Sequence, residues 1–363
     1  MMGVSYNVGE VAPFVVMVIM EGCTIALTIM AKTAISGGMS PFVFVLYTNA
    51  LGSIILFPCS FLFHRERVEQ LLFTLPLLLR LFFLGFTGIA LSQNLAFVGL
   101  SYSSPIVVCA MGLLIPAFSF ILSIILRMKK LEWSSSSFQF KVLGTLISAI
   151  GAVIVELYKG PYIREASSSS LKLKQKQHLF VFYSAPDRWV LGGLLLAASC
   201  LCNSIWNVIQ LGTVKQYPQV MKIASFYSLA GTIQCAIFSL IVERDLNAWK
   251  IKHNMDLLLI VLTAIFGSVI RSSVHISFTR MKGPFYVPLF QPFRVFWATC
   301  FGVSFFVNSL HYGSVIGTVI CGMGYYTVTW GQTREDEKRK NFDVERANSS
   351  EEKVPLLQQD AEV

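Results

Sequence analysis

The chain has 363 residues, of which 54% are hydrophobic and 13% are charged. A soluble domain carries about 25% charged residues, so this chain has too little polar surface to cover a water-facing globule. The net charge of +9 raises the question of nucleic-acid binding. The Lys and Arg residues, however, lie between apolar runs and form no patch interleaved with aromatic residues. We therefore expect a multi-pass membrane protein in contact with the lipid bilayer, and no nucleic-acid partner.

Ten apolar stretches are long enough to span a membrane, since a helix needs about 20 residues to cross the hydrocarbon core. Turn residues such as Gly37-Gly38 and Gly283-Pro284 separate them. In chain order, the expected spans are 11–31, 42–63, 76–98, 105–126, 142–158, 189–212, 222–243, 257–279, 285–307 and 313–331.

The basic residues also predict an orientation, because loops rich in Lys and Arg stay in the cytosol. Their summed bias places both termini in the cytosol. Glu10 and Lys32, which flank the first span, favour the reverse on their own.

The stretch 160–187 is rich in Ser and Lys and is expected to be a flexible linker. The charged segment 333–363 is expected to be a disordered cytosolic tail.

A sequence match between the two halves predicts the architecture. Residues 142–155 (VLGTLISAIGAVIV) and 315–328 (VIGTVICGMGYYTV) share six of fourteen positions. Each copy closes a block of five apolar stretches, and two blocks with an odd number of spans must lie in opposite orientations. We expect an all-α membrane protein of ten helices in two inverted five-helix repeats, 10–159 and 188–332. Secondary transporters are often built in this way, with a substrate site between the halves.

Charged side chains inside a span are costly and often mark a transport pathway. Within the expected spans we single out Glu21, Arg271, Arg294 and His275, the last one helical turn beyond Arg271. One hypothesis is that Arg294 or Arg271 holds a substrate carboxylate, while Glu21 meets an ammonium group or cycles a proton. The alternative is that Arg271 forms a purely structural pair with Glu21.

Polar amides are the second group of candidates for the substrate site. They either line a central cavity or join helices by hydrogen bonds. This group comprises Asn49, Gln93, Asn94, Asn203, Asn207 and Gln291.

Glycines and prolines mark positions of close packing and of helix interruption. Gly144, Gly151, Gly313 and Gly317 are expected to let helices of the two repeats approach closely. Pro116 and Pro292 interrupt the fourth and ninth expected spans at corresponding places, which is typical of helices beside a cavity.

The motifs of common enzymes and nucleotide-binding sites do not occur in the sequence: it has no H-E-x-x-H, no Walker A, no G-x-S-x-G and no G-x-G-x-x-G. All eight cysteines lie in apolar stretches without metal or redox spacing. We expect no enzyme activity, no cofactor and no metal.

Glu352 to Leu357 fits an acidic dileucine signal, so Leu356-Leu357 is a candidate contact for a sorting adaptor. Homodimerisation is left open.

The chain resembles plant members of the drug/metabolite transporter superfamily. These are the EamA-type, nodulin-21-like or "walls are thin"-related proteins, also called usually-multiple-acids-move-in-and-out transporters. The resemblance covers residues 10 to 332. The motifs that carry it are Gln93-Asn94, Gly99-Leu100-Ser101-Tyr102, Pro116-Ala117, Arg127-Met128, Leu157-Tyr158-Lys159-Gly160-Pro161, Tyr217-Pro218, Glu243-Arg244-Asp245, Lys282-Gly283-Pro284 and Trp330-Gly331.

This resemblance implies ten helices, transport of amino acids or of auxin-like compounds, and residence in the plasma membrane or the tonoplast. The sequence departs from the family pattern at Thr48, Leu113, Arg294 and Asn308. The leading hypothesis is a facilitator or proton-linked exporter of small organic solutes that works by alternating access, with amino acids as the leading substrate class. The alternatives are a carrier of anionic metabolites or auxin-like acids, and a transport-inactive scaffold that acts through its tail.

Overall fold

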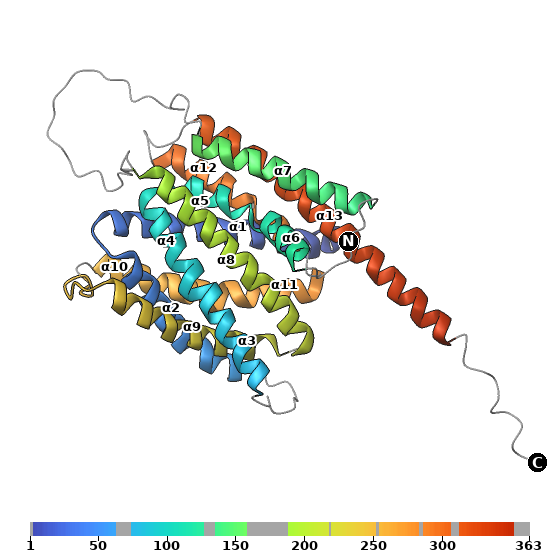
Figure 1. Cartoon of the computed structure of the whole chain (residues 1–363), viewed down its shortest axis with the longest axis horizontal. Helices are drawn as coiled ribbons and strands as arrows, with labels where there is room; N and C mark the ends of the chain where they lie inside the picture. The colour runs from blue at the N-terminus through green and yellow to red at the C-terminus, as the bar shows by residue number, and fades with distance from the viewer. Residues whose placement is uncertain are drawn as a thin grey trace, which may run out of the picture.

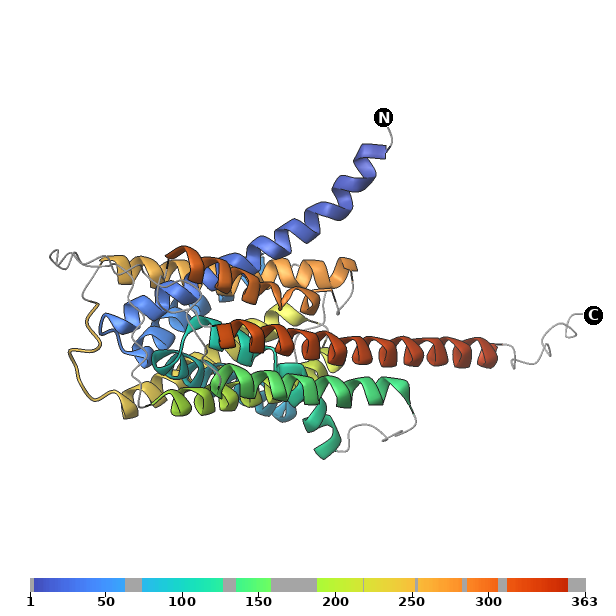
Figure 2. The same cartoon turned by 90° about the horizontal axis from the view of Figure 1, so that it is seen from above.

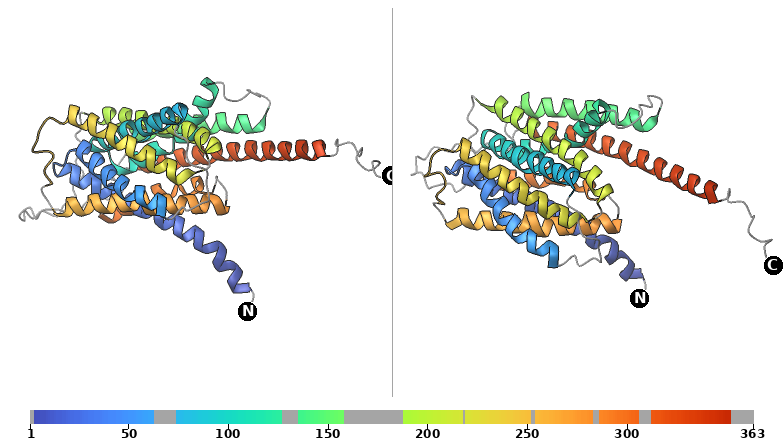
Figure 3. Two further views of the ribbon diagram at one scale, coloured as in Figure 1. Left: turned by 90° about the horizontal axis from the view of Figure 1, so that it is seen from below. Right: turned by 60° about the horizontal axis from the view of Figure 1, so that its bottom comes forward.

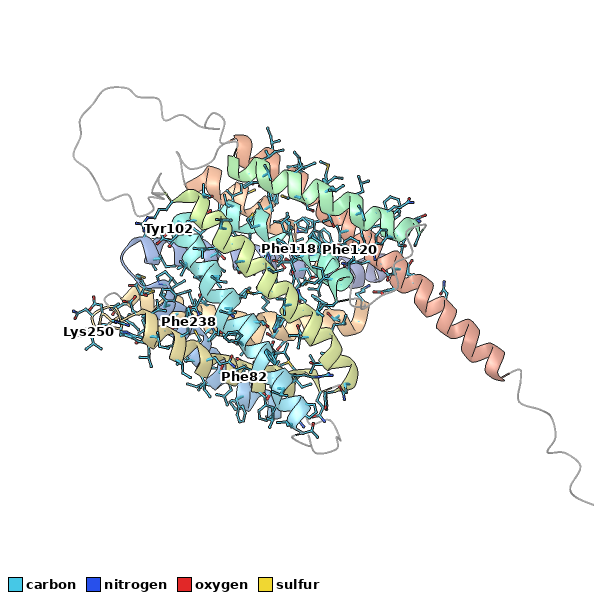
Figure 4. All side chains as sticks on the ribbon, in the orientation of Figure 1. Phe82, Tyr102, Phe118, Phe120, Phe238 and Lys250 are labelled. Carbon is cyan, nitrogen blue, oxygen red and sulfur yellow. The ribbon has the colours of Figure 1, made fainter. Side chains whose placement is uncertain are left out.

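The computed structural model describes residues 3–62, 74–126, 135–157, 188–217, 219–251, 254–282, 286–305 and 312–351. Helices that run side by side form the bundle shown in Figure 1, and the described residues contain no strand. Large apolar side chains such as Phe82 and Phe238 are exposed on its outer surface (Figure 4). This arrangement suits a lipid environment, in which the backbone must satisfy its own hydrogen bonds.

The first half of the chain forms two long helices, an interrupted third span, a broken fourth span and a final helix. Its elements are α1 (Gly3–Ser36), α2 (Pro41–Leu62), α3 (Leu75–Gly85), η1 (Phe86–Leu91), α4 (Ser92–Tyr102), α5 (Pro105–Gly112), α6 (Ile115–Ile125) and α7 (Ser136–Leu157). Here η1 is a stretch of π-helix, and π-helical turns often lie at functional sites.

The second half repeats this order. Its elements are α8 (Trp189–Gln216), α9 (Val220–Val242), α10 (Asn254–Ala264), η2 (Ile265–Arg271), α11 (Ser272–Lys282), η3 (Pro288–Phe290), α12 (Phe293–Phe305) and α13 (Tyr312–Glu351). In both halves the third span consists of a π-helical stretch between two α-helices of 11 residues. The fourth span of each half is broken next to Pro116 or Pro292, as expected from those prolines.

Contacts between the halves are also symmetric. Helix α2 packs against α9, and α7 packs against α13. Helix α1 lies against α10 and α12, and its counterpart α8 lies against α3 and α6, the corresponding helices of the first half. The repeated element order and these reciprocal contacts are those of two inverted five-helix repeats.

Within the described residues, eight helical stretches are long and apolar enough to cross a membrane. They are Ala12–Ser36, Pro41–Ser60, Leu75–Tyr102, Pro105–Ile125, Ser136–Val155, Val190–Val214, Val220–Val242 and Asn254–Thr279. The other two expected spans correspond to α12, which has 13 residues, and to the first part of α13. Spans that follow one another run in opposite directions, and the start of α1 and the end of α13 lie at the same end of the bundle (Figure 2). An even number of crossings produces this arrangement.

Glycines bring α7 and α13 together, as the sequence predicts for Gly144, Gly151 and Gly317. These helices lie side by side in Figures 1 and 3. A Cβ atom placed on Gly151 would lie 2.6 Å from the backbone nitrogen of Cys321, and one on Gly317 would lie 2.7 Å from the backbone nitrogen of Val155. Only glycine permits this backbone approach between the last helices of the two repeats.

The expectation of disorder from residue 333 is wrong for the part that the structure describes, because α13 continues to Glu351. The segment is poor in apolar residues but rich in acidic residues followed four positions later by basic ones, such as Glu335 and Arg339, and such pairs support a helix. Near the start of this extension, Lys141 of α7 forms an ion pair with Glu335. The expected linker 160–187 and the dileucine Leu356-Leu357 lie outside the described residues.

Candidate functional site

An ion pair between α1 and α12 lies at the centre of the site. Nε of Arg294 donates a hydrogen bond to Oε2 of Glu21, and Nη2 of Arg294 lies 3.5 Å from Oε1. Glu21 is 1% exposed, and the side chain of Arg294 is 19% exposed. The acid of the first span is therefore bound by the arginine of the ninth.

The break at Pro292 explains why Arg294 can reach Glu21. Helix α12 begins at Phe293, so Arg294 lies in its first turn rather than in the middle of a longer helix. The start of a helix carries partial positive charge, which adds to that of the guanidinium. This end of the broken span is therefore suited to negative groups.

Trp297, one turn after Arg294, fixes the spacing of the same two helices. Its indole Nε1 donates to the carbonyl of Val18 at 2.9 Å. A Cβ atom placed on Gly22 would lie 2.9 Å from the indole ring, so the ring packs directly on the backbone beside Glu21. The sequence analysis missed Trp297, although its i,i+3 spacing from Arg294 is visible in the sequence.

Arg271 occupies the last position of η2 and is half-buried. It makes no hydrogen bond or ion pair with any part of the chain that the structure describes, yet it lies close enough to act electrostatically on Glu21 and Arg294. His275, one turn further along, also acts on Glu21, and its Nε2 is buried without a hydrogen-bond partner among the described residues. The alternative that the sequence analysis left open, a structural pair between Arg271 and Glu21, does not form: Glu21 pairs with Arg294 instead.

Two further buried side chains border this group. Cys109 of α5 and Tyr325 of α13 both interact electrostatically with Glu21 and Arg294. The hydroxyl of Tyr325 donates to the carbonyl of Pro288 at 2.6 Å. We call the Glu21–Arg294 pair and the four residues within electrostatic range of it the central cluster: Glu21, Cys109, Arg271, His275, Arg294 and Tyr325.

Three of the expected amides join helices instead. Nδ2 of Asn49 donates to Oε1 of Gln93 at 2.6 Å and so links α2 to α4. Asn94 is 2% exposed, and its Nδ2 donates to the carbonyl of Ala90 at 2.7 Å and to the sulfur of Cys235 on α9 at 3.3 Å. These contacts match the alternative in which amides hold helices together.

The remaining expected amides have free hydrogen-bonding groups. Asn203 and Asn207 on α8, and Gln291 just before α12, are half-buried. Their side chains form no hydrogen bond in the part of the chain that the structure describes. None of the contacts described above joins them to the central cluster.

The structure also contains a buried cation that the sequence analysis read only as a flanking charge. Lys32 of α1 is 1% exposed, and its Nζ donates to the carbonyls of Leu100 and Ser101 at 2.8 Å each. These carbonyls lie at the C-terminal end of α4, where the helix dipole favours a cation. Figure 4 places Tyr102, the last residue of α4, at the end of the bundle opposite the chain termini.

Comparisons with known proteins agree with this architecture. Residues 14–157 match the EamA-like transporter family. Two WAT1-related proteins of Arabidopsis thaliana are similar over nearly their full length. One is 61% identical, with 98% of each chain covered, and the other is 56% identical, with 96% of this chain and 95% of the relative covered.

The chain belongs to the WAT1-related, EamA-type transporters. It is thus a multi-pass membrane transporter of small solutes, and the family is one of transporters rather than enzymes. A solved structure titled "Crystal structure of protein" is 15% identical, with a TM-score of 0.52 and coverage of 88% of this chain and 96% of that one. That likeness concerns the fold alone. In this WAT1-related protein, the residues of the central cluster come from α1, α5, α12, α13 and the η2–α11 span.

Proposed function

We propose that this transporter carries small organic carboxylates, and that Arg271 binds the carboxylate group beside the Glu21–Arg294 pair. The observation that supports this proposal is the guanidinium of Arg271, which has no partner among the described residues and lies near an acid that another arginine already binds. A guanidinium binds a carboxylate through two parallel hydrogen bonds. His275 is a second group with an unused hydrogen-bonding atom near the same place.

The charge of the central cluster favours an organic anion over an amino acid. Two arginines and one glutamate leave one positive charge, which a single carboxylate neutralises. An amino acid adds an ammonium group, and the only acid deep in the expected spans is Glu21. Because Arg294 already binds Glu21, an ammonium group has to compete for it.

An amino acid is nevertheless the second candidate, and the Glu21–Arg294 pair is the observation in its favour. A zwitterion can replace an ion pair by exchange, with its carboxylate on Arg294 and its ammonium group on Glu21. In that case the pair opens whenever substrate binds. In either case we propose alternating access between the two repeats, with both termini in the cytosol and the protein in the plasma membrane or the tonoplast.

The test is uptake and efflux in oocytes that express wild type, Arg271→Gln or Arg80→Gln, at equal surface levels. The panel contains labelled pyruvate, gluconate, malate, alanine and glutamine. Loss of one charge-assisted contact, worth about 2 kcal/mol, should raise the half-saturating concentration of an organic acid about 30-fold in Arg271→Gln. Arg80→Gln is the matched control, since Arg80 is also half-buried but lies outside the central cluster, where its Nη1 donates to the carbonyl of Gly212. Flux of alanine or glutamine alone, unchanged in Arg271→Gln, would contradict the proposal.

A further inference from the structure

The protein groups of the central cluster carry an uncompensated positive charge. Arg271 is half-buried and lies within electrostatic range of the ion pair between Arg294 of α12 and Glu21 of α1. His275 of α11, Cys109 of α5 and Tyr325 of α13 complete the cluster, and none of them is an acid like Glu21. Among the described residues of the cluster, one carboxylate therefore faces two guanidinium groups.

The excess positive charge should affect the conformational change of the substrate-bound transporter differently from that of the substrate-free transporter. An unpaired charge inside a bilayer is costly, and the cost falls when a counter-ion neutralises it. With a carboxylate bound to Arg271, the cluster is neutral as the repeats rearrange around it. Without a carboxylate, the same rearrangement passes an unpaired guanidinium through the closed intermediate.

We infer that the protein is an anion exchanger. The transition between its inward-facing and outward-facing states is much faster with a carboxylate bound to the central cluster than without one. The inference rests on the proposed function and adds the coupling that the proposal leaves open. One carboxylate moves in as another moves out, so a full cycle carries no net charge across the membrane. Arg271 is the residue that imposes the exchange, because its charge hinders the return of the empty carrier.

The position of Arg271 in the fold supports its assignment to this role. It ends the π-helical stretch η2, while the corresponding stretch in the first half, η1, ends at the apolar residue Leu91. The two repeats therefore match in backbone but differ in charge at this place. A cation whose only task was to hold helices together would be expected to have a hydrogen-bond partner, as Lys32 has.

The experiment uses the full-length chain, purified and reconstituted in liposomes at pH 7.4. Uptake of labelled pyruvate, gluconate and malate is measured in turn, into vesicles that contain the same unlabelled anion or only buffer. Potassium and valinomycin set the membrane potential, and protein-free vesicles give the leak. Wild type, Arg271→Lys and Arg271→Gln are compared after thermal unfolding in detergent has shown that each is folded.

We expect internal anion to raise uptake about tenfold in wild type and in Arg271→Lys, which keeps the charge, and this exchange to be independent of the membrane potential. In Arg271→Gln we expect weaker binding and equal uptake with or without internal anion. Equal uptake in wild type would overturn the exchange mechanism and leave the proposed function standing. Stimulation that persists in Arg271→Gln would overturn the role of Arg271. No uptake of any anion under either condition would overturn the proposed function itself.

Discussion

Glu21 and Arg294 form an ion pair between residues that are 273 positions apart, from the first span of one repeat to the ninth span in the other. The pair joins α1 to α12, and Trp297 joins the same helices through the carbonyl of Val18. A buried acid with a single arginine partner is expected to contribute strongly to the stability of this interface. Because Arg294 takes this partner, Arg271 is the arginine of the central cluster that has no ion pair among the described residues.

Removing either partner of this pair should destabilise the protein. Glu21→Gln or Arg294→Gln leaves a charge without its partner, and a fully buried pair costs 3–5 kcal/mol when one side is removed. Because Arg294 is 19% exposed, we expect about 2–3 kcal/mol for each single variant. Thermal unfolding in detergent measures the effect.

The double variant Glu21→Gln/Arg294→Gln is the control for this prediction. Since it contains neither charge, its loss of stability should be smaller than the sum of the two single losses. Additive losses would show that the two side chains do not stabilise each other, which would contradict the pairing.

The contact between α7 and α13 can be tested with two glycines of the same helix. A Cβ atom on Gly324 would lie 2.7 Å from the carbonyl oxygen of Gly144, whereas one on Gly322 would meet nothing within 4 Å. Gly324→Ala should therefore force the helices apart and lower the unfolding temperature. Gly322→Ala should leave it unchanged or raise it, because alanine favours a helix over glycine by about 1 kcal/mol. Equal effects of the two substitutions would show that the glycines do not determine this interface.

Much of the fold follows from the sequence because lipid leaves the chain few options. A span of apolar residues in a bilayer has to be helical, so the lengths of the apolar runs predict the helices. The shared glycines at Gly144 and Gly317 then predict that the last helices of the two repeats pack together. The breaks next to Pro116 and Pro292 also follow from the sequence, because proline lacks the backbone N–H that continues a helix.

The pairing of charged groups could not be predicted in this way. Whether Glu21 meets Arg271 or Arg294 depends on how each helix is rotated and on where α12 begins, and neither is visible in a hydropathy pattern. The same holds for Gln93 and Asn94, which are adjacent in sequence but bond to Asn49 and to Cys235 on different helices. Lys32 looked like a flanking charge because the carbonyls that bind it come from a helix 68 positions away.

Lys32 is expected to hold the end of α1 against the end of α4. Lys32→Met keeps much of the side-chain length but leaves the carbonyls of Leu100 and Ser101 without their buried donor, which should cost about 1–3 kcal/mol of stability. Lys250→Met is the control, since Lys250 is exposed at the same end of the bundle (Figure 4). A Lys32→Met variant as stable as Lys250→Met would show that the two hydrogen bonds contribute nothing.

The part of α13 that follows the tenth expected span should depend on its ion pair with α7. Lys141 is 6% exposed, forms an ion pair with Glu335, and lies 5.1 Å from the ring centre of Phe120. Lys141→Glu places two acids against each other, so we expect a lower unfolding temperature and faster proteolysis of the chain after Trp330. The exchanged pair Lys141→Glu/Glu335→Lys should recover part of the loss, because it restores opposite charges at the same positions. If the exchanged pair is no more stable than Lys141→Glu alone, the ion pair between Lys141 and Glu335 does not hold α13 to α7.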